Sequence, residues 1–183
     1  MTKEFSPQRL DVKAFAQAQA HLDGQQPLSQ FNRLALEAQG PHEGVYVRWA
    51  VQGELRAEAG ADAQVWLHLQ AETDLPMICQ RCLTLAPIPL DVERSFRFVA
   101  DEATAEALDD ESEEDLLALS KEFDLFELLE DELLMELPVV PLHDICPEAV
   151  PLASSDDDFE QANSEKPNPF AALAGLRIAK PKQ

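Results

Sequence analysis

The sequence predicts an α+β fold around a small antiparallel sheet that could close into a barrel. Three runs, at 45–56, 63–73 and 88–99, alternate apolar and polar residues in the way that half-buried strands do. Short turns with Gly53 and Gly60 join the first two runs, which favours antiparallel pairing. Two other stretches repeat apolar residues with the helical period. With 183 residues, 45% of them hydrophobic, the chain can bury one core.

The N-terminal region predicts a helix followed by a strand. Residues 6–23 begin with Ser6, a capping residue, and Pro7, which suits the first turn of a helix. Gly24 then ends the helical pattern. Residues 31–38 alternate well enough to predict a strand. The apolar face of the predicted helix consists of Leu10, Ala14, Phe15, Ala18 and Leu22.

The stretch from Asp124 to Cys146 predicts an amphipathic helix and an extended strap. Asp124 can cap the helix, with Glu127 at the third helical position as in a capping box. Pro138 stops the helix, because proline disfavours helical geometry in the residue before it. We expect 139–141 to run extended against apolar surface. Four leucines should share the buried face, Leu125, Leu128, Leu129 and Leu133, with Glu127, Glu130 and Asp131 pointing elsewhere.

The negative charge is concentrated in one segment of the chain. Residues 101–160 hold 22 acidic side chains and one basic one, whereas 161–183 carry four basic side chains and one acidic one. We expect one domain over 1–150, with an exposed, disordered acidic insertion at 101–121. A flexible linker and a short basic helix should follow at 151–183. Three apolar residues of that helix, Phe170, Leu173 and Leu176, are candidates for binding a partner, and the alternative is that they dock on the body of the protein.

The sequence predicts a cytoplasmic protein. It lacks a run of about 18 apolar residues, which a membrane span requires, and its N-terminus does not resemble a signal peptide. The three cysteines should therefore be reduced thiols or metal ligands.

The three cysteines and one histidine form two short motifs with the spacing of metal ligands. Cys79 and Cys82 lie in the loop between two predicted strands, and the strap ends in His143 and Cys146. Together they would form a closed Cys₃His site for zinc, a metal that favours thiolate and imidazole ligands. The alternative is that the thiols are partly buried packing residues.

Two chemical roles for these residues are disfavoured. A redox dithiol would be better placed at the start of a helix, where a thiolate is stabilised. His143 and Asp144 beside Cys146 resemble a nucleophilic triad, but neighbours on an extended strap point to opposite sides. We therefore expect no enzyme, and a closed four-ligand site would also count against a metal-dependent enzyme.

Arginines along the predicted strands suggest contacts with RNA. If they share one open face, they could contact phosphates, while Trp49 and Trp66 could stack on bases. The alternative is ordinary sheet surface, with arginine stems covering apolar neighbours. The candidate RNA-binding residues are Arg48, Arg56, Arg81, Arg94 and Arg97 of the strands and Arg177, Lys180 and Lys182 of the tail.

Three segments together resemble the YceD family of large ribosomal RNA subunit accumulation proteins. They are CQRC at 79–82, EDELLMELPVVPLH at 130–143 and KPNPFAALAGL at 166–176, and FNRLALE at 31–37 also fits. The resemblance implies a cytoplasmic bacterial protein needed for accumulation of large-subunit (23S) ribosomal RNA, and it carries over no catalytic residue.

Two modes of action are compatible with that resemblance. In one, the arginine-bearing sheet and basic tail bind ribosomal RNA or its precursor directly. In the other, the acidic segment 101–160 acts as a chaperone or adaptor that holds a basic ribosomal protein before assembly. The charge distribution favours the second mode for the acidic segment.

Overall fold

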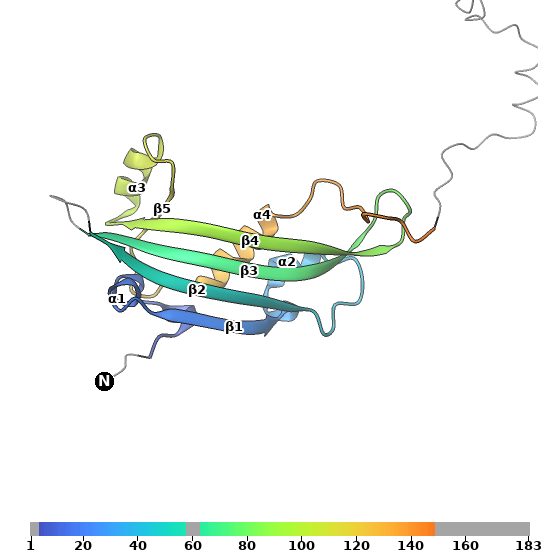
Figure 1. Ribbon diagram of the computed structural model, residues 1–183, viewed down its shortest axis with the longest axis horizontal. Coiled ribbons are helices and arrows are strands. Elements are labelled where there is room, and N and C mark those ends of the chain that lie inside the picture. The colour runs from blue at the N-terminus through green and yellow to red at the C-terminus, as the bar shows by residue number, and fades with distance from the viewer. Residues whose placement is uncertain (1–3, 58–62, 149–183) are drawn as a thin grey trace, which may run out of the picture. The chain divides into compact units, whose positions relative to one another are not determined.

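One mixed five-stranded sheet forms the centre of the molecule in the computed structural model, which describes residues 4–57 and 63–148. The strands are β1 (His21–Pro27), β2 (Tyr46–Arg56), β3 (Gln64–Ile78), β4 (Leu85–Val99) and β5 (Asp115–Ala118). They lie side by side in chain order (Figure 1). The first four pair antiparallel, and β5 pairs parallel to β4. The predicted α+β class is confirmed, but the sheet does not close into a barrel and is not purely antiparallel.

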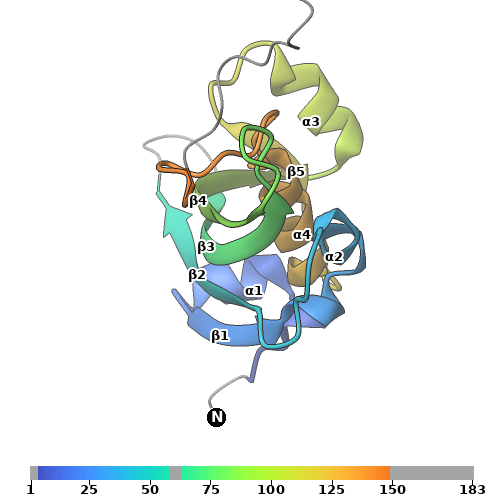
Figure 2. The same cartoon turned by 90° about the vertical axis from the view of Figure 1, so that its right-hand side faces the viewer.

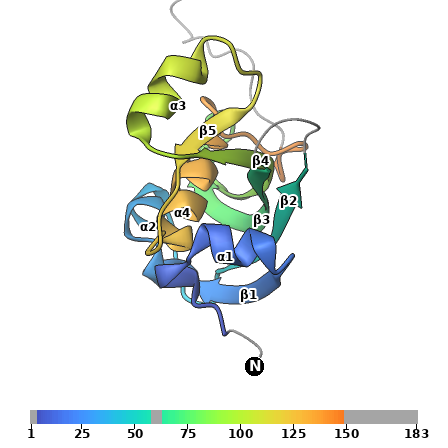
Figure 3. The same ribbon diagram turned by 90° about the vertical axis from the view of Figure 1, so that its left-hand side faces the viewer.

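The helices lie mainly on one face of this sheet. They are α1 (Val12–Gln17), α2 (Asn32–Glu37), α3 (Glu102–Asp109) and α4 (Leu125–Met135), with short 3₁₀ turns η1 (Pro7–Arg9) and η2 (Leu28–Gln30). Helices α1, α2 and α4 cover one face, whereas α3 lies beyond β4 next to β5 (Figures 2 and 3). Because strand side chains alternate, residues such as Leu67, Leu69 and Phe96 are buried under the helices. The other face of the sheet is open to solvent, and we call it the open face.

The predicted helix over 6–23 is wrong in length. Its residues form η1, then α1, and at His21 they enter strand β1. Ser6 makes no capping hydrogen bond; Asp11 caps α1 instead, accepting a hydrogen bond from the Ala14 N–H at 3.1 Å. Because the real cap stands five residues later, the helix is shorter than the apolar pattern suggested.

Gly24 lies within β1 and does not end a helix. It pairs with Trp49 of β2. A Cβ atom at this position would come within 2.9 Å of the Trp49 ring. The glycine is therefore needed for the close approach of the indole to the edge strand.

The predicted strand at 31–38 is wrong, because these residues contain helix α2. Their apolar positions also fit a helical period, and Leu34 is buried. Phe31 at the N-cap offers no capping side chain. The cap comes from α4: Glu130 Oε1 accepts hydrogen bonds from the N–H groups of Arg33 at 2.7 Å and Leu34 at 3.1 Å. Glu130, predicted to point away from the core, is in fact 9% exposed.

The acidic insertion at 101–121 is ordered, contrary to prediction. It folds into α3 and β5. Asp101 caps α3 by accepting a hydrogen bond from the Thr104 N–H at 2.8 Å. Strand β5 adds to β4, and Arg94 donates a hydrogen bond to Asp115 at 2.6 Å across that pair. Local caps and sheet pairing thus hold a segment whose composition alone suggests disorder.

The central helix forms as predicted. Asp124 accepts hydrogen bonds from the N–H groups of Phe126 at 2.9 Å and Glu127 at 3.4 Å. The helix ends before Pro138, and its four face leucines are buried. The strap that follows is less covered than expected, because Val139 is fully exposed.

The predicted linker and basic helix at 151–183 lie outside the described residues. No helix within 4–57 and 63–148 is long and apolar enough to cross a lipid bilayer. The residues of the tail that were expected to bind RNA or a partner also lie outside this part of the chain, namely Phe170, Leu173, Leu176, Arg177, Lys180 and Lys182.

Replacing Glu130 by alanine is expected to lower the free energy of unfolding by about 2 kcal/mol, because the first N–H groups of α2 lose their acceptor. Urea unfolding followed by tryptophan fluorescence measures the change. Asp131→Ala is the matched control, since within the described part of the chain this carboxylate bonds only the exposed end of Arg33 in the same pair of helices. Equal losses in both variants would contradict the capping role of Glu130.

Candidate metal centre

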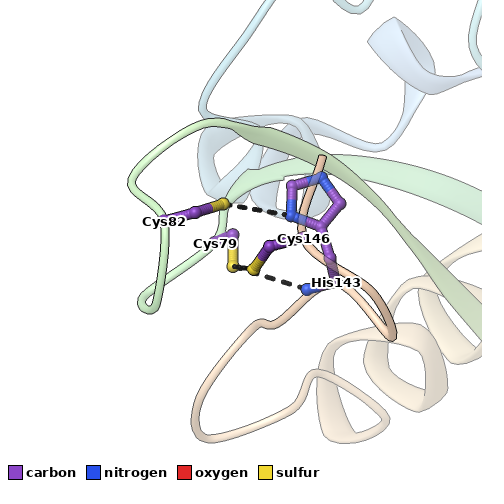
Figure 4. Close-up of side chains that lie close together, drawn as sticks. All are labelled: Cys79, Cys82, His143 and Cys146. Atoms are coloured by element: carbon purple, nitrogen blue, oxygen red, sulfur yellow. Dashed lines mark hydrogen bonds between the residues drawn. The ribbon is translucent and has the colours of Figure 1, made fainter. Parts of the chain in front are cut away.

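The tip of the β3–β4 hairpin holds the first two cysteines. The Cys79 N–H donates to the Thr84 carbonyl at 2.9 Å, and the Leu83 N–H donates to the Cys79 carbonyl at 2.8 Å. Leu83 takes a positive φ of 59°, a conformation that lets the chain turn back sharply. This tight turn places the thiols of Cys79 and Cys82 on the same side of the loop (Figure 4).

The strap after α4 brings the other two residues to the hairpin tip. Its Pro141 is buried, and the Pro141 carbonyl accepts a hydrogen bond from the Gln80 N–H at 2.9 Å. This contact fixes the path of the chain just before His143. The side chains of His143 and Cys146 then face the two thiols of the hairpin (Figure 4).

The four side chains converge closely enough to hold one metal ion. The sulfurs of Cys79 and Cys146 are 4.0 Å apart, and Cys82 Sγ is 3.4 Å from His143 Nδ1. All four ligand atoms lie within 4.8 Å of one another. Zinc bonds of about 2.3 Å to sulfur and about 2.0 Å to nitrogen would place tetrahedral ligands about 3.8 Å (S to S) and about 3.5 Å (S to N) apart. The cluster could therefore hold a metal ion with little movement.

Each sulfur of the cluster receives a hydrogen bond from a group that is not itself one of the four candidate ligand atoms. Such donors stabilise the thiolate form that binds metals. They are the His143 N–H to Cys79 at 3.4 Å, the Thr84 hydroxyl to Cys82 at 3.1 Å and Arg81 Nε to Cys146 at 3.1 Å.

The His143 ring is oriented by the backbone of β4. Its Nε2 lies 3.0 Å from the Leu85 carbonyl. A carbonyl oxygen can only accept a hydrogen bond, so Nε2 carries the proton. In the neutral ring, Nδ1 then carries the lone pair that faces the sulfurs, the tautomer that ligation through Nδ1 requires, whereas the hydrogen bonds to Cys79 and Cys82 raise the pKa of His143 and favour the protonated ring when no metal is bound.

The hydrogen bonds of the cluster also shift the pKa values of its thiols. Burial raises the pKa of Cys79, but the N–H groups of His143, Cys82 and Arg81 outweigh it and bring that pKa down to about 5. The Thr84 hydroxyl lowers the pKa of Cys82. Burial raises the pKa of Cys146 despite the nearby guanidinium. The pKa values of two of the three thiols are thus shifted toward the thiolate form that binds metals.

The cluster does not have the geometry of a nucleophilic triad. The two ring nitrogens of His143 face Cys82 and the Leu85 carbonyl. Within residues 4–57 and 63–148, Asp144 contributes its backbone carbonyl to Arg81 and makes no carboxylate contact with the imidazole.

The structure separates the candidate RNA-binding arginines. Arg48, Arg56 and Arg97 lie on the open face, Arg94 lies on the face that carries the helices, and Arg81 belongs to the cysteine cluster. They do not form one basic surface.

Most of these arginines are engaged by acidic side chains of the same chain. Arg48 pairs with Glu72 at 2.6 Å, and Arg56 pairs with Glu54 at 3.0 Å. Arg94 pairs with Asp115 at 2.6 Å and lies 3.6 Å from Glu132. Arg97 has no ion-pair partner among the described residues.

Neither tryptophan is free to stack on a base. Trp49 is buried on the helix side of β2, where its ring meets Phe126 edge to face at 5.6 Å. Trp66 is on the open face, but the guanidinium of Arg56 covers its ring at 4.0 Å and leaves it 4% exposed.

The open face carries a group of carboxylates near the β2–β4 centre. Glu72 lies directly opposite Asp91, and Glu93 lies opposite Gln70. Like charges in directly opposed positions destabilise a sheet, and Arg48 is paired with only one of them. A shallow depression of about 380 Å³ lies among these side chains, lined by Arg48, Ala50, Gln70, Glu72, Asp91 and Glu93.

Several residues that complete the candidate metal site could not be identified as such from the sequence alone. Arg81 was assigned to RNA, although its place between the two cysteines was a signal for a role in the cluster. Thr84 follows Cys82 by two residues and offered a similar signal. The Leu85 carbonyl carries no sequence signal, because any residue would supply it.

Comparison with known proteins gives a family match over most of the chain. A family model described as "Large ribosomal RNA subunit accumulation protein YceD" matches residues 67–177. A protein of that name from Haemophilus influenzae is 32% identical over 111 residues, which cover 59% of this chain and 63% of the relative. The chain thus spans less than two thirds of that relative. No solved structure matches.

Proposed function

Because the chain belongs to the YceD family of large ribosomal RNA subunit accumulation proteins, we propose that it supports the accumulation of large-subunit (23S) ribosomal RNA. We propose that it does so as a non-enzymatic factor in the cytoplasm. The matched region includes the hairpin tip, the strap and the carboxylates of β3 and β4. The features used in the proposals below therefore lie within the matched region.

In this proposal the protein acts by holding a basic ribosomal protein before assembly. The observation that carries this mode is the charge near the centre of the open face, where the carboxylates of Glu72, Asp91 and Glu93 gather beside Arg48. Arg56 and Arg97 lie on the same face but beside Gln64 and Trp66, toward another end of the strands. Such a surface attracts lysine and arginine side chains and repels a polyanion. The docking surface then lies on the sheet, and the α3–β5 segment adds to its negative field.

Direct binding of ribosomal RNA is the second candidate. Arg97 lacks an ion-pair partner within the described residues, and Arg56 lies on the same face with one side of its guanidinium on Trp66. The basic tail would add Arg177, Lys180 and Lys182. Against this candidate, Arg48, Arg56 and Arg94 already have carboxylate partners that phosphates would have to displace.

Neutralising the open face is expected to weaken capture of a basic large-subunit ribosomal protein. The double variant Asp91→Asn, Glu93→Gln should bind the basic protein about tenfold more weakly, because it loses two negative charges that attract the lysine and arginine side chains of that protein. Its affinity should also depend less on salt. Binding to purified basic ribosomal proteins and to a 23S RNA fragment is measured by titration at several salt concentrations.

The double variant Glu111→Gln, Glu113→Gln is the matched control, since it removes the same charge from the exposed loop between α3 and β5. It should change binding much less. If it weakens capture as much as the sheet variant, net charge explains the binding and the sheet is not the docking surface. Direct RNA binding would be favoured if Arg97→Gln lost RNA binding while neither double variant changed the capture of the ribosomal protein.

We also propose that the cluster of Cys79, Cys82, His143 and Cys146 holds a zinc ion. The near-tetrahedral spacing of three sulfurs and one imidazole nitrogen supports zinc over harder metals, which prefer oxygen ligands. Four protein ligands leave no open position for a substrate, so the site would be structural.

Protein purified under reducing conditions is expected to contain about one zinc ion per chain by elemental analysis. His143→Gln should lower that content and the metal affinity, because the imidazole ligand is lost. His21→Gln, on the exposed edge strand β1, should retain full zinc content as the control. A wild-type chain that stays free of zinc after reconstitution would refute the site.

A further inference from the structure

Arg81 connects the two halves of the candidate metal centre. It lies between Cys79 and Cys82 on the hairpin tip, but its guanidinium reaches the end of the strap. Its Nε donates to Cys146 Sγ at 3.1 Å, and its Nη2 donates to the His143 carbonyl at 2.5 Å. The Asp144 carbonyl lies 3.4 Å from the same Nη2. One side chain therefore holds both a ligand sulfur and the backbone that carries the other strap ligand.

The charge of the centre also favours an arginine in this position. Three thiolates and one neutral imidazole around a divalent zinc ion leave one net negative charge. Cys79 is buried and the other ligands are half-buried, so this charge is only partly hydrated. Within the described residues, Arg81 is the cation that bonds a ligand of the cluster, and its single positive charge would make the whole unit neutral.

We propose that Arg81 is the outer-sphere positioning residue of the zinc centre, which orients the Cys146 thiolate and the His143 backbone and balances the charge of the Cys₃His–zinc unit. This inference rests on the zinc site proposed above. It assigns to Arg81 a task in metal binding instead of a task in contacting RNA.

The geometry requires the shape of a guanidinium as well as its charge. Nε and Nη2 lie on one edge of a planar fork and reach a sulfur and a carbonyl oxygen at the same time. A lysine ammonium could approach one of these acceptors but has no fixed fork to hold both. We therefore expect lysine to replace arginine poorly here.

Arg81 also carries much of the attachment of the strap. Apart from the four ligand residues, the bonds between the hairpin tip and the described strap are those of Arg81 and the Gln80–Pro141 backbone bond at 2.9 Å. Loss of Arg81 should thus loosen residues 143–146 even when zinc is present.

The test uses the full chain and compares wild type with Arg81→Lys, Arg81→Gln and the control Arg97→Gln on the open face. Zinc affinity is measured by competition with a chelator of known affinity. The set of metal ligands is monitored by the thiolate-to-metal absorption of the cobalt-substituted protein. Both Arg81 variants should lose about 10- to 100-fold in zinc affinity and show an altered cobalt spectrum. Arg97→Gln should match wild type in both measurements.

The outcomes separate the inference from the zinc site itself. If wild type binds neither zinc nor cobalt, the zinc site fails and this inference fails with it. If wild type binds zinc and both Arg81 variants bind within about twofold of it, with the same cobalt spectrum, only the inference is overturned. Circular dichroism checks folding, and if Arg81→Gln does not fold, the result for Arg81→Lys decides.

Discussion

The antiparallel register between β3 and β4 is the constraint on which the other features depend. Fourteen residue pairs, from Val65 with Phe98 to Ile78 with Leu85, fix which side chains lie under the helices and which face solvent. A slip of one residue would exchange the two faces. For β4, such a slip would expose Phe96 and bury Asp91 and Glu93, two of the carboxylates that give the open face its charge. The same register ends the hairpin at Cys79, where a tight turn can present two thiols. Core, charged face and cluster are thus consequences of one strand pairing.

The candidate metal centre joins parts of the chain that the sheet alone does not hold together. Helix α4 is anchored in the core through Leu129 and Leu133, but the strap beyond it has little regular structure and an exposed Val139. A metal ion among the four ligands would fix the end of this strap to the hairpin tip. The distribution of hydrogen-bond donors around the sulfurs indicates that the protein is organised for thiolates at this point.

Features set by local sequence were predicted well, and features set by distant partners were not. The central helix could be predicted because Asp124 caps it and Pro138 ends it within one stretch. The two Cys/His motifs, predicted as metal ligands from their own spacing, do converge in the structure. Helix α2 was missed because its capping carboxylate, Glu130, lies 97 residues from Arg33. The pairing of Arg48 with Glu72 is likewise a product of strand register, so the sequence could not show that this arginine is already neutralised.

The short length of β5 leaves part of the sheet edge without a neighbouring strand. Strand β5 pairs with residues 96–99 of β4, and no strand in the described part of the chain pairs with 85–95 on that side. The Val99 carbonyl accepts a hydrogen bond from the Leu119 N–H on this side of β4. Because alternate residues of a strand direct their backbone groups to opposite sides, the odd-numbered residues of β4 direct their N–H and C=O groups toward this edge and the even-numbered ones toward β3. Pro87 and Pro89 are odd-numbered and have no N–H to offer. An incoming strand would therefore lack donors there, which protects the protein from edge-to-edge self-association and aggregation.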